Sequence, residues 1–255
     1  MTKTCLITGA SRGIGFATAV ALAEEGFDIA ALALPDGERM TELRQKVEAL
    51  GRRFAAYEFD LGVLEQHAPV IDQVLATFGS IDCLVNDAGV SVLSRGDLLD
   101  VSRESFDRCF AVNTRGTFFF TQAVARHMAK SQTAAEAYRS IVFITSSNAV
   151  AASVERGEYC MSKTALSMAC KLFALRLVGH GIGVFEVQPG MILTEMTAPS
   201  KARYDKLIAE GLTVDRRWGT PEDVARVVRT MAAGLLPYTV AQDVRVDGGL
   251  LLTRF

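Results

Sequence analysis

The sequence predicts one α/β domain built on a doubly wound, seven-stranded parallel sheet. Short apolar runs alternate along its 255 residues with longer segments of helical period. The apolar runs are nearly continuous, as expected of strands that helices cover on both faces. No Pro/Ser-rich linker, internal repeat or low-complexity tract divides the chain. Parallel strands joined by helices need right-handed crossovers over the sheet, so a doubly wound arrangement follows.

Seven segments have the pattern of strands, and helical segments lie between them. The expected strands are 4–8, 28–34, 54–59, 81–86, 140–145, 183–188 and 243–246. The expected helices include 11–25, 38–50, 102–130, 157–178 and a short one at 203–210. Gly51 follows the second of these helices and is expected to end it.

Composition and charge exclude several classes of protein. The 27 Lys and Arg against 29 Asp and Glu leave a net charge of -2, too balanced for a chain that binds nucleic acid through its phosphates. The five cysteines form no Cys-x-x-Cys pair and the three histidines are widely spaced, so we expect free thiols and no metal site. Without a signal-peptide pattern or a long apolar run, a cytoplasmic protein with no membrane partner is expected.

A glycine-rich turn follows the first expected strand and leads directly into a helix. Its sequence is Gly9-Ala10-Ser11-Arg12-Gly13-Ile14-Gly15. Glycines let the backbone turn sharply and let a pyrophosphate approach the free N–H groups at the start of the helix. The spacing differs from Gly-x-Gly-x-x-Gly, and an ordinary βα turn is the alternative. The position of the glycines favours a dinucleotide site.

Tyr159 and Lys163 are four residues apart in the expected helix 157–178, so both side chains project from one face. An ammonium beside a phenol favours the phenolate, which suits Tyr159 to act as a general acid or base. Ser146 follows the strand 140–145 and is expected to reach the same crevice and hold a carbonyl or hydroxyl by a hydrogen bond. A tyrosine and a lysine on an exposed helix face are the alternative for this spacing.

These motifs together resemble the single-domain short-chain dehydrogenase/reductase family, in particular bacterial 3-oxoacyl-(acyl-carrier-protein) reductases and their relatives acting on sugars and other alcohols. The residues that carry the resemblance are Thr8 to Gly15, Asn86-Asp87-Ala88-Gly89, Asn113, Ser146, Tyr159, Lys163, Pro189-Gly190 and Thr194. The match covers essentially the whole chain. It implies a Rossmann-like fold of seven strands, and homotetramers are usual in the family.

The resemblance also assigns roles to individual positions. It implies the catalytic set Ser146, Tyr159, Lys163 and Asn113, in which Asn113 holds a water that links Lys163 to solvent. The implied cofactor-binding residues are Gly9, Ser11, Arg12, Gly13, Ile14, Gly15, Asp60, Leu61, Asn86, Ala88, Gly89, Tyr159, Lys163, Pro189, Gly190, Ile192 and Thr194. Asp87 departs from the family, which usually carries Asn there. Asp keeps the acceptor but loses the amide donor, and we expect cofactor binding to survive.

The second strand bears on the choice between NAD and NADP. An acidic residue at its end would bind the ribose 2′-hydroxyl of NAD and repel a 2′-phosphate. By register that position is Ala33, and Asp36 lies too far along to be its certain replacement. Arg12 in the glycine turn can pair with a phosphate. NADP(H) is therefore favoured slightly over NAD(H), although no second basic residue is evident after the strand.

Substrate specificity is expected to lie in residues 150–158 and in a substrate loop at 191–217. Apolar residues of that loop would form a lid suited to an acyl thioester, and they are Met191, Ile192, Leu193, Met196 and Tyr204. A sugar would need more polar contacts, which Glu155 and Arg156 offer. The alternative is that the apolar residues only pack the loop or a subunit contact.

The expected function is hydride transfer between a nicotinamide cofactor and a carbonyl or secondary alcohol, first as a 3-oxoacyl thioester reductase. A dehydrogenase of a sugar or other small alcohol is the alternative, and a non-catalytic protein that senses dinucleotides is the alternative of another class. The helices 102–130 and 157–178 carry apolar residues on more than one face. We therefore expect a homodimer or homotetramer.

Overall fold

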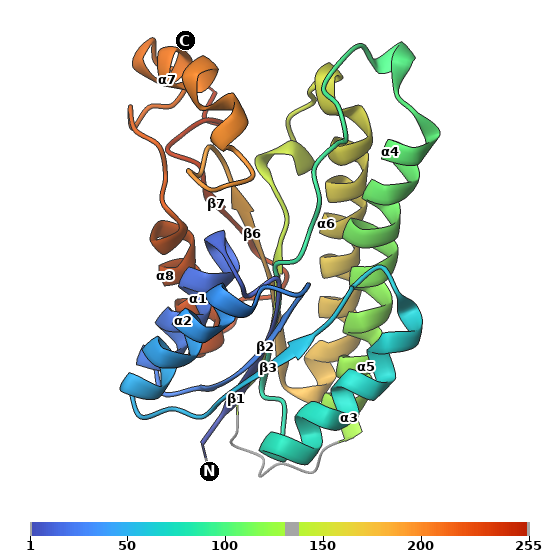
Figure 1. The fold of residues 1–255 in the computed structure, drawn as a ribbon, viewed down its shortest axis with the longest axis vertical. Coiled ribbons are helices and arrows are strands. Elements are labelled where there is room, and N and C mark those ends of the chain that lie inside the picture. The colour runs from blue at the N-terminus through green and yellow to red at the C-terminus, as the bar shows by residue number, and fades with distance from the viewer. Residues whose placement is uncertain (1, 131–137, 254–255) are drawn as a thin grey trace.

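A computed structural model describes residues 2–130 and 138–253 and confirms the predicted fold class (Figure 1). Seven parallel strands form one sheet in the order β3-β2-β1-β4-β5-β6-β7. The strands are β1 (Thr4–Thr8), β2 (Asp28–Ala33), β3 (Phe54–Glu58), β4 (Cys83–Asn86), β5 (Arg139–Ile144), β6 (Ile182–Pro189) and β7 (Asp243–Val246). Every predicted strand is present, and each boundary lies within two residues of its expected place.

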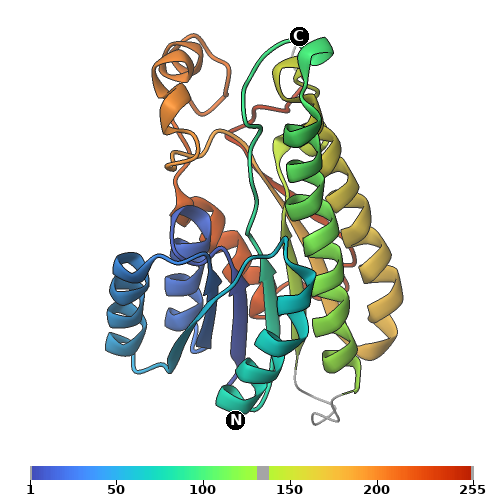
Figure 2. The same cartoon turned by 45° about the vertical axis from the view of Figure 1, so that its right-hand side comes forward.

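Helices cover both faces of this sheet, as Figures 1 and 2 show. On one side lie α1 (Gly13–Glu24), α2 (Gly37–Ala49) and α8 (Pro221–Ala232). On the other lie α3 (His67–Phe78), α4 (Arg103–Cys109), α5 (Thr117–Lys130) and α6 (Gly157–Leu177). The helix α7 (Lys201–Ala209) stands apart, beyond the carboxyl ends of the strands.

Each face of the sheet has its own apolar core. Leu22 of α1, Leu43 of α2 and Val228 of α8 are fully buried in one core. Phe120 of α5 and Phe143 of β5 are fully buried in the other. Because the five inner strands are buried on both faces, their sequences are apolar at nearly every position, whereas exposure alternates along the edge strands β3 and β7. That is the pattern that predicted the sheet.

The chain reverses its direction across the sheet between β1 and β4. The strand β1 pairs with β2 on one side and with β4 on the other. The turns that follow β1 and β4 therefore lead to helices on opposite faces and leave a crevice at the carboxyl ends of the strands. Ligands of doubly wound folds bind in such a crevice.

The expected continuous helix 102–130 is wrong in one respect. The segment η3 (Phe110–Gly116), between α4 and α5, is a π-helix, which widens the turn. A Cβ on Gly116 would overlap the carbonyl oxygen of Leu61, so the backbones meet there without an intervening side chain. This close approach of a second segment is a tertiary contact that helical periodicity does not reveal.

The remaining helical predictions differ only at their ends. The short helix expected at 203–210 is α7, which begins and ends slightly earlier, at Lys201 and Ala209. The predicted glycine stop is the residue after Leu50, the C-cap of α2. All five cysteines are free, and only Cys160 is not fully buried. No helix in the described part of the chain is both long and apolar enough to cross a membrane.

Candidate active site

The glycine turn after β1 is packed too tightly for side chains. Gly9 has φ +75°, and a Cβ there would lie 2.9 Å from Cα of Ala88. A Cβ on Gly15 would overlap the carbonyl oxygen of Gly9 and lie 2.7 Å from Oδ2 of Asp87. Gly13 has φ +55° and, like Gly9, favours glycine for its backbone conformation. Because these glycines have no side chains, a ligand could approach the backbone N–H groups at the start of α1 closely.

The turn after β4 is joined to the first turn by hydrogen bonds. The hydroxyl of Thr8 accepts from the backbone N–H of Asp87 and of Ala88, both at 3.1 Å. Asn86 donates from Nδ2 to the hydroxyl of Thr121 at 3.0 Å, while its Oδ1 is buried with no hydrogen-bond partner among residues 2–130 and 138–253. A buried acceptor without a donor is costly. This orphaned oxygen, beside a cradle that a Cβ would fill, fits a site for a polar ligand such as a dinucleotide.

Tyr159 and Lys163 lie one turn apart on α6, and both are almost completely buried. Nζ of Lys163 donates to the carbonyl oxygen of Ile144 at 3.0 Å and lies 5.8 Å from the centre of the Tyr159 ring. Within the described residues the Tyr159 hydroxyl makes no hydrogen bond. Ser146 follows β5, and its Oγ accepts from the backbone N–H of Asn148 at 3.1 Å. That contact leaves the proton of the Ser146 hydroxyl available to donate.

Asn113 lies in the π-helical segment and is fully buried. Its Oδ1 accepts from the N–H of Val90 at 2.8 Å, and its Nδ2 donates to the carbonyl of Val90 and the hydroxyl of Ser162, both at 3.0 Å. A Cβ on Gly89 would lie 3.2 Å from Oδ1 of Asn113 and 3.4 Å from Nζ of Lys163. The structure therefore brings Asn113 and Lys163 together around Gly89. Because the amide is fully engaged, its expected role in holding water stays a prediction.

The predicted residues after β6 reach the same region. Gly190 follows β6 and donates its N–H to the carbonyl of Val246 at 2.9 Å. Ile192 is buried, and the methyl carbon of Thr194 would lie 3.5 Å from a Cβ on Gly13. Thr194 thus lies beside the glycine turn, although almost 180 residues separate the two in sequence. Pro189, the last residue of β6, completes this group.

Asp60 and Leu61 lie at the end of β3, farther along the crevice. Oδ1 of Asp60 accepts from the N–H of Gly62 at 2.8 Å, and Leu61 is buried. Since the backbone oxygen of Leu61 meets Gly116, this turn is fixed against the π-helical segment. These two predicted residues therefore lie in the turn that follows β3, and no described contact joins them to Tyr159.

The prediction that no second basic residue follows the second strand is wrong, because Arg39 lies after it and shares a partner with Arg12. The structure places both guanidinium groups on the carboxylate of Glu195: Arg12 at 3.3 Å, and Arg39 on the other oxygen. Arg39 lies in the first turn of α2, the helix that follows β2, and Glu195 lies in the predicted substrate loop. No local pattern indicated this pair, because the contact joins segments more than 150 residues apart.

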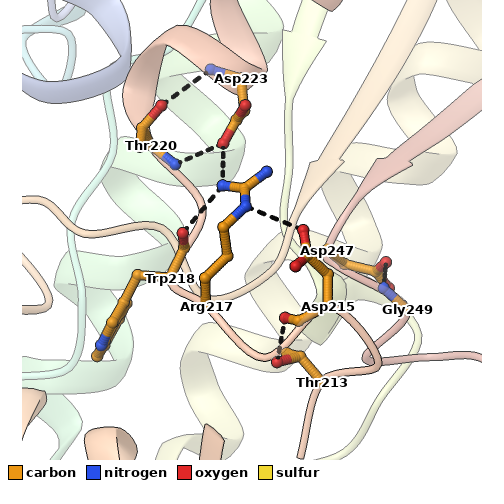
Figure 3. A network of polar contacts seen from close by, with 8 residues as sticks. All are labelled: Thr213, Asp215, Arg217, Trp218, Thr220, Asp223, Asp247 and Gly249. Carbon is orange, nitrogen blue, oxygen red and sulfur yellow. Dashed lines mark hydrogen bonds and ion pairs between the residues drawn. The ribbon is translucent and has the colours of Figure 1, made fainter.

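The predicted substrate loop is anchored at its end by Arg217 (Figure 3). Nε of Arg217 lies 2.9 Å from Asp215, and Nη1 lies 2.7 Å from Asp223. Asp223 also forms the capping box of α8 with Thr220. The N–H of Asp215 donates to the carbonyl of Gly248 at 2.9 Å. The loop therefore ends at a fixed point between α8 and the turn after β7.

Comparison with known proteins gives a match over nearly the whole chain. The family model described as Enoyl-(Acyl carrier protein) reductase matches residues 9–251. A 2-dehydro-3-deoxy-D-gluconate 5-dehydrogenase of Dickeya dadantii is 32% identical over 251 residues, which are 98% of this chain and 95% of the relative.

Solved structures give the same result. A 3-oxoacyl-[acyl-carrier protein] reductase of Brucella melitensis in complex with NAD has a TM-score of 0.95 at 42% identity, with 100% of this chain and 99% of that chain covered. A short-chain type dehydrogenase/reductase of Mycobacterium marinum has a TM-score of 0.90 at 30% identity, with 98% and 96% covered. Both likenesses extend across the sheet, the crevice and the predicted substrate loop.

Asp87 has an unusual environment for a carboxyl group. Burial raises its pKa from 3.8 to about 7, although the charge of Lys163 and a hydrogen bond from the Gly15 backbone act in the opposite direction. The folded protein therefore holds a proton on Asp87 at mildly acidic pH, where an unfolded chain, with an ordinary aspartate pKa of about 3.9, has already lost it. As pH rises from about 4 through 7, this contribution to the free energy of unfolding is lost.

We predict that Asp87→Asn removes this pH dependence. The asparagine variant should gain stability relative to the native chain by about 1–3 kcal/mol between pH 5 and pH 8. Urea unfolding at a series of pH values measures the difference. Asp72→Asn, the same chemical change at an exposed position on α3, is the matched control. A difference between Asp87→Asn and the native chain that stays constant from pH 4 to 8 contradicts the assignment.

Proposed function

The chain belongs to the short-chain dehydrogenase/reductase family, and on that premise we propose that Tyr159 is the group that exchanges a proton with its substrate. The family membership makes it an oxidoreductase of alcohol and carbonyl groups. The observation that supports the role of Tyr159 is its buried ring beside Lys163. Its hydroxyl forms no hydrogen bond with any described residue.

The residues of the site divide the chemistry among them. A nicotinamide cofactor supplies or accepts the hydride when bound. The Tyr159 hydroxyl donates a proton to the carbonyl oxygen during reduction and takes it back during oxidation. The free proton of the Ser146 hydroxyl holds the same oxygen by a hydrogen bond. The ammonium of Lys163 lies where negative charge develops on the phenol, and so stabilises the reacting state.

The two glycine-containing turns would hold the cofactor. Gly9, Gly13 and Gly15 have no Cβ beside the start of α1, so the N–H groups there would donate to a pyrophosphate. Asn86, Ala88 and Gly89 would line the opposite side of the crevice. The other predicted contacts, from Ser11, Arg12, Ile14, Asp60, Leu61, Pro189, Gly190, Ile192 and Thr194, would complete the site.

The Tyr159→Phe variant tests this mechanism. Loss of the hydroxyl should lower the turnover number by about 10²–10⁴-fold, because general acid–base catalysis contributes about that factor. Oxidation of NADPH and of NADH is followed with ketoacyl, sugar and cyclic ketone substrates. Dinucleotide binding, measured by isothermal titration calorimetry, should persist in the variant.

Two results would contradict the mechanism. Unchanged turnover in Tyr159→Phe would remove the proton-transfer role of the hydroxyl. Dinucleotide binding by the native chain without turnover of any carbonyl compound would instead favour the non-catalytic sensing protein. Phe106→Leu, a change in α4 outside the site, controls for effects of a substituted aromatic ring.

We propose NADP(H) as the preferred cofactor. Arg12 and Arg39 converge on Glu195 at the position expected for the adenosine ribose, where β2 ends in Ala33 rather than in an acid. A 2′-phosphate would take the place of Glu195 between the two guanidinium groups. The Brucella melitensis relative was solved with NAD, so the preference for NADP(H) or NAD(H) has to be measured for each chain.

The ratio of kcat/KM for NADPH to that for NADH tests this preference. In Arg39→Gln the ratio should fall about 10-fold or more, since a charge-assisted hydrogen bond contributes about 1.5–3 kcal/mol. In Glu195→Gln the ratio should rise, because the competing carboxylate is removed. Arg44→Gln, one turn farther along α2, is the matched control. A native preference for NADH that Arg39→Gln leaves unchanged would overturn the proposal.

Two substrate classes remain candidates. A 3-oxoacyl thioester is supported by the name of the Brucella melitensis relative and by exposed apolar side chains of the predicted loop 191–217, Leu193 and Met196. A sugar or other small alcohol is supported by the name of the Dickeya dadantii relative. Charged side chains at the entrance, where Arg203 lies 2.9 Å from Glu155, also favour this second class. The expected cytoplasmic location stays a prediction.

We propose that the chain forms a homodimer or homotetramer through α5 and α6. Met168, Leu172 and Leu175 of α6 are more than half exposed in the single chain, and Phe119 of α5 is 43% exposed. Met168, Leu172 and Phe119 line one apolar groove between the helices. Apolar surface of this kind commonly marks a contact between proteins, and a second copy presents a matching face.

Light scattering coupled to size-exclusion chromatography measures the assembly. The native chain should elute as a dimer or tetramer, and the double variant Met168→Glu/Leu172→Glu should dissociate because it places four charges or more in each symmetric interface. Leu99→Glu, at an exposed leucine outside these helices, should leave the mass unchanged. A native chain that elutes only as a monomer would contradict the proposal.

A further inference from the structure

Arg156 lies directly against the proposed catalytic tyrosine. It ends the short helix η5 (Val154–Arg156), and α6 begins at the next residue. Its Cζ is 4.2 Å from the centre of the Tyr159 ring, closer than Nζ of Lys163 at 5.8 Å. A guanidinium over an aromatic ring is an attractive arrangement. It fixes the position of the Arg156 head group without using any of its N–H donors.

The N–H donors of Arg156 have no acceptor in the described part of the chain. Its Nε is buried and without a partner, and no ion pair joins its guanidinium to a described carboxylate. Glu158, two residues away, forms no described ion pair with Arg156: its Oε1 accepts from the hydroxyl of Ser105 at 2.6 Å, and its Oε2 is buried with no hydrogen-bond partner among the described residues. A buried donor without an acceptor carries a desolvation cost that a bound ligand would relieve. Arginine is suited to bind a carboxylate through two parallel hydrogen bonds.

Two further arginines contact Glu155, the residue that precedes Arg156. Arg95 of the segment after β4 lies 4.0 Å from Glu155, and Arg203 of α7 lies 2.9 Å from the same carboxylate. Arg95 also donates to the hydroxyl of Tyr204 at 3.4 Å. One carboxylate is therefore shared by two guanidinium groups, while Arg156 has none. Three arginines, Arg95, Arg156 and Arg203, thus stand against the two carboxylates of Glu155 and Glu158, so one positive charge is left to attract an anion.

We propose that Arg156 binds a carboxylate on the substrate, a few bonds from the carbon that is oxidised or reduced; this rests on the proposed role of Tyr159. The substrate carboxylate would lie close to the reacting carbon because Tyr159 carries the reacting hydroxyl and its ring also contacts the Arg156 guanidinium. The substrates indicated are short oxo acids and hydroxy acids, sugar acids included. An acyl thioester carries no charge beside its 3-oxo group, so this inference separates the two candidate classes.

Matched acid and ester pairs test the proposal. The probes are 3-oxobutanoate and 4-oxopentanoate, each compared with its ethyl ester, with the cofactor that the chain prefers. In the native chain kcat/KM should be about 10-fold or more higher for the better acid than for its ester. In Arg156→Gln this ratio should fall about 10- to 100-fold, the range expected for a charge-assisted hydrogen bond. Arg156→Lys should recover part of the ratio, because it keeps the charge but not the planar fork.

Two kinetic outcomes overturn the proposal. One is equal use of acid and ester by the native chain. The other is an equal loss on acid and ester in Arg156→Gln, which would mean that Arg156 acts only on Tyr159. Arg226→Gln, at an exposed position on α8, is the control and should leave the ratio unchanged.

A binding measurement decides the case if neither pair is turned over. Calorimetry of the cofactor-saturated protein compares 3-hydroxybutanoate with the neutral 3-hydroxybutanamide. Tighter binding of the acid, lost in Arg156→Gln, supports the proposal, and no preference for the acid overturns it. Failure of the proposed function has a different signature: Tyr159→Phe then turns over neutral ketones as fast as the native chain does.

Discussion

The close contact between the turns after β1 and β4 is the constraint on which the rest of the site depends. Gly15 lies against the backbone of Gly9 and the carboxyl group of Asp87, and no space for a Cβ remains. The hydroxyl of Thr8 ties the same turns together by accepting from two backbone N–H groups. The strands β1 and β4 are neighbours at the point where the order of strands along the chain reverses. This contact therefore lies at the crevice that ligands of such folds occupy.

The reacting groups are fixed to the same crevice from its other side. Lys163 is held by the carbonyl of Ile144, the last residue of β5, so α6 carries Tyr159 to the carboxyl end of the sheet. The π-helical segment brings Asn113 against Val90, in the chain that leaves β4. The proposed proton transfer therefore rests on backbone contacts at the ends of two strands, while the choice of substrate is proposed to depend on Arg156, against the Tyr159 ring.

The sequence predicted the inner strands most directly, because strands buried on both faces are apolar throughout and need no knowledge of their neighbours. It also predicted that Tyr159 and Lys163 lie side by side on one helix, as the structure confirms, while their catalytic roles stay a prediction. It did not reveal the π-helical turn, which depends on the approach of Leu61 to Gly116. Nor did it reveal Arg39 beside Arg12, or the Arg156 side chain over the Tyr159 ring, because these are contacts between side chains whose directions only the folded chain defines.

We propose that the crevice between the turns after β1 and β4 binds a nicotinamide dinucleotide beside Tyr159. A crystal structure of the protein with its dinucleotide would show whether it does. We expect the pyrophosphate against the backbone N–H groups of residues 9–15 and the nicotinamide end toward Tyr159 and Lys163. A dinucleotide bound away from these turns, or with its nicotinamide remote from Tyr159, would contradict it.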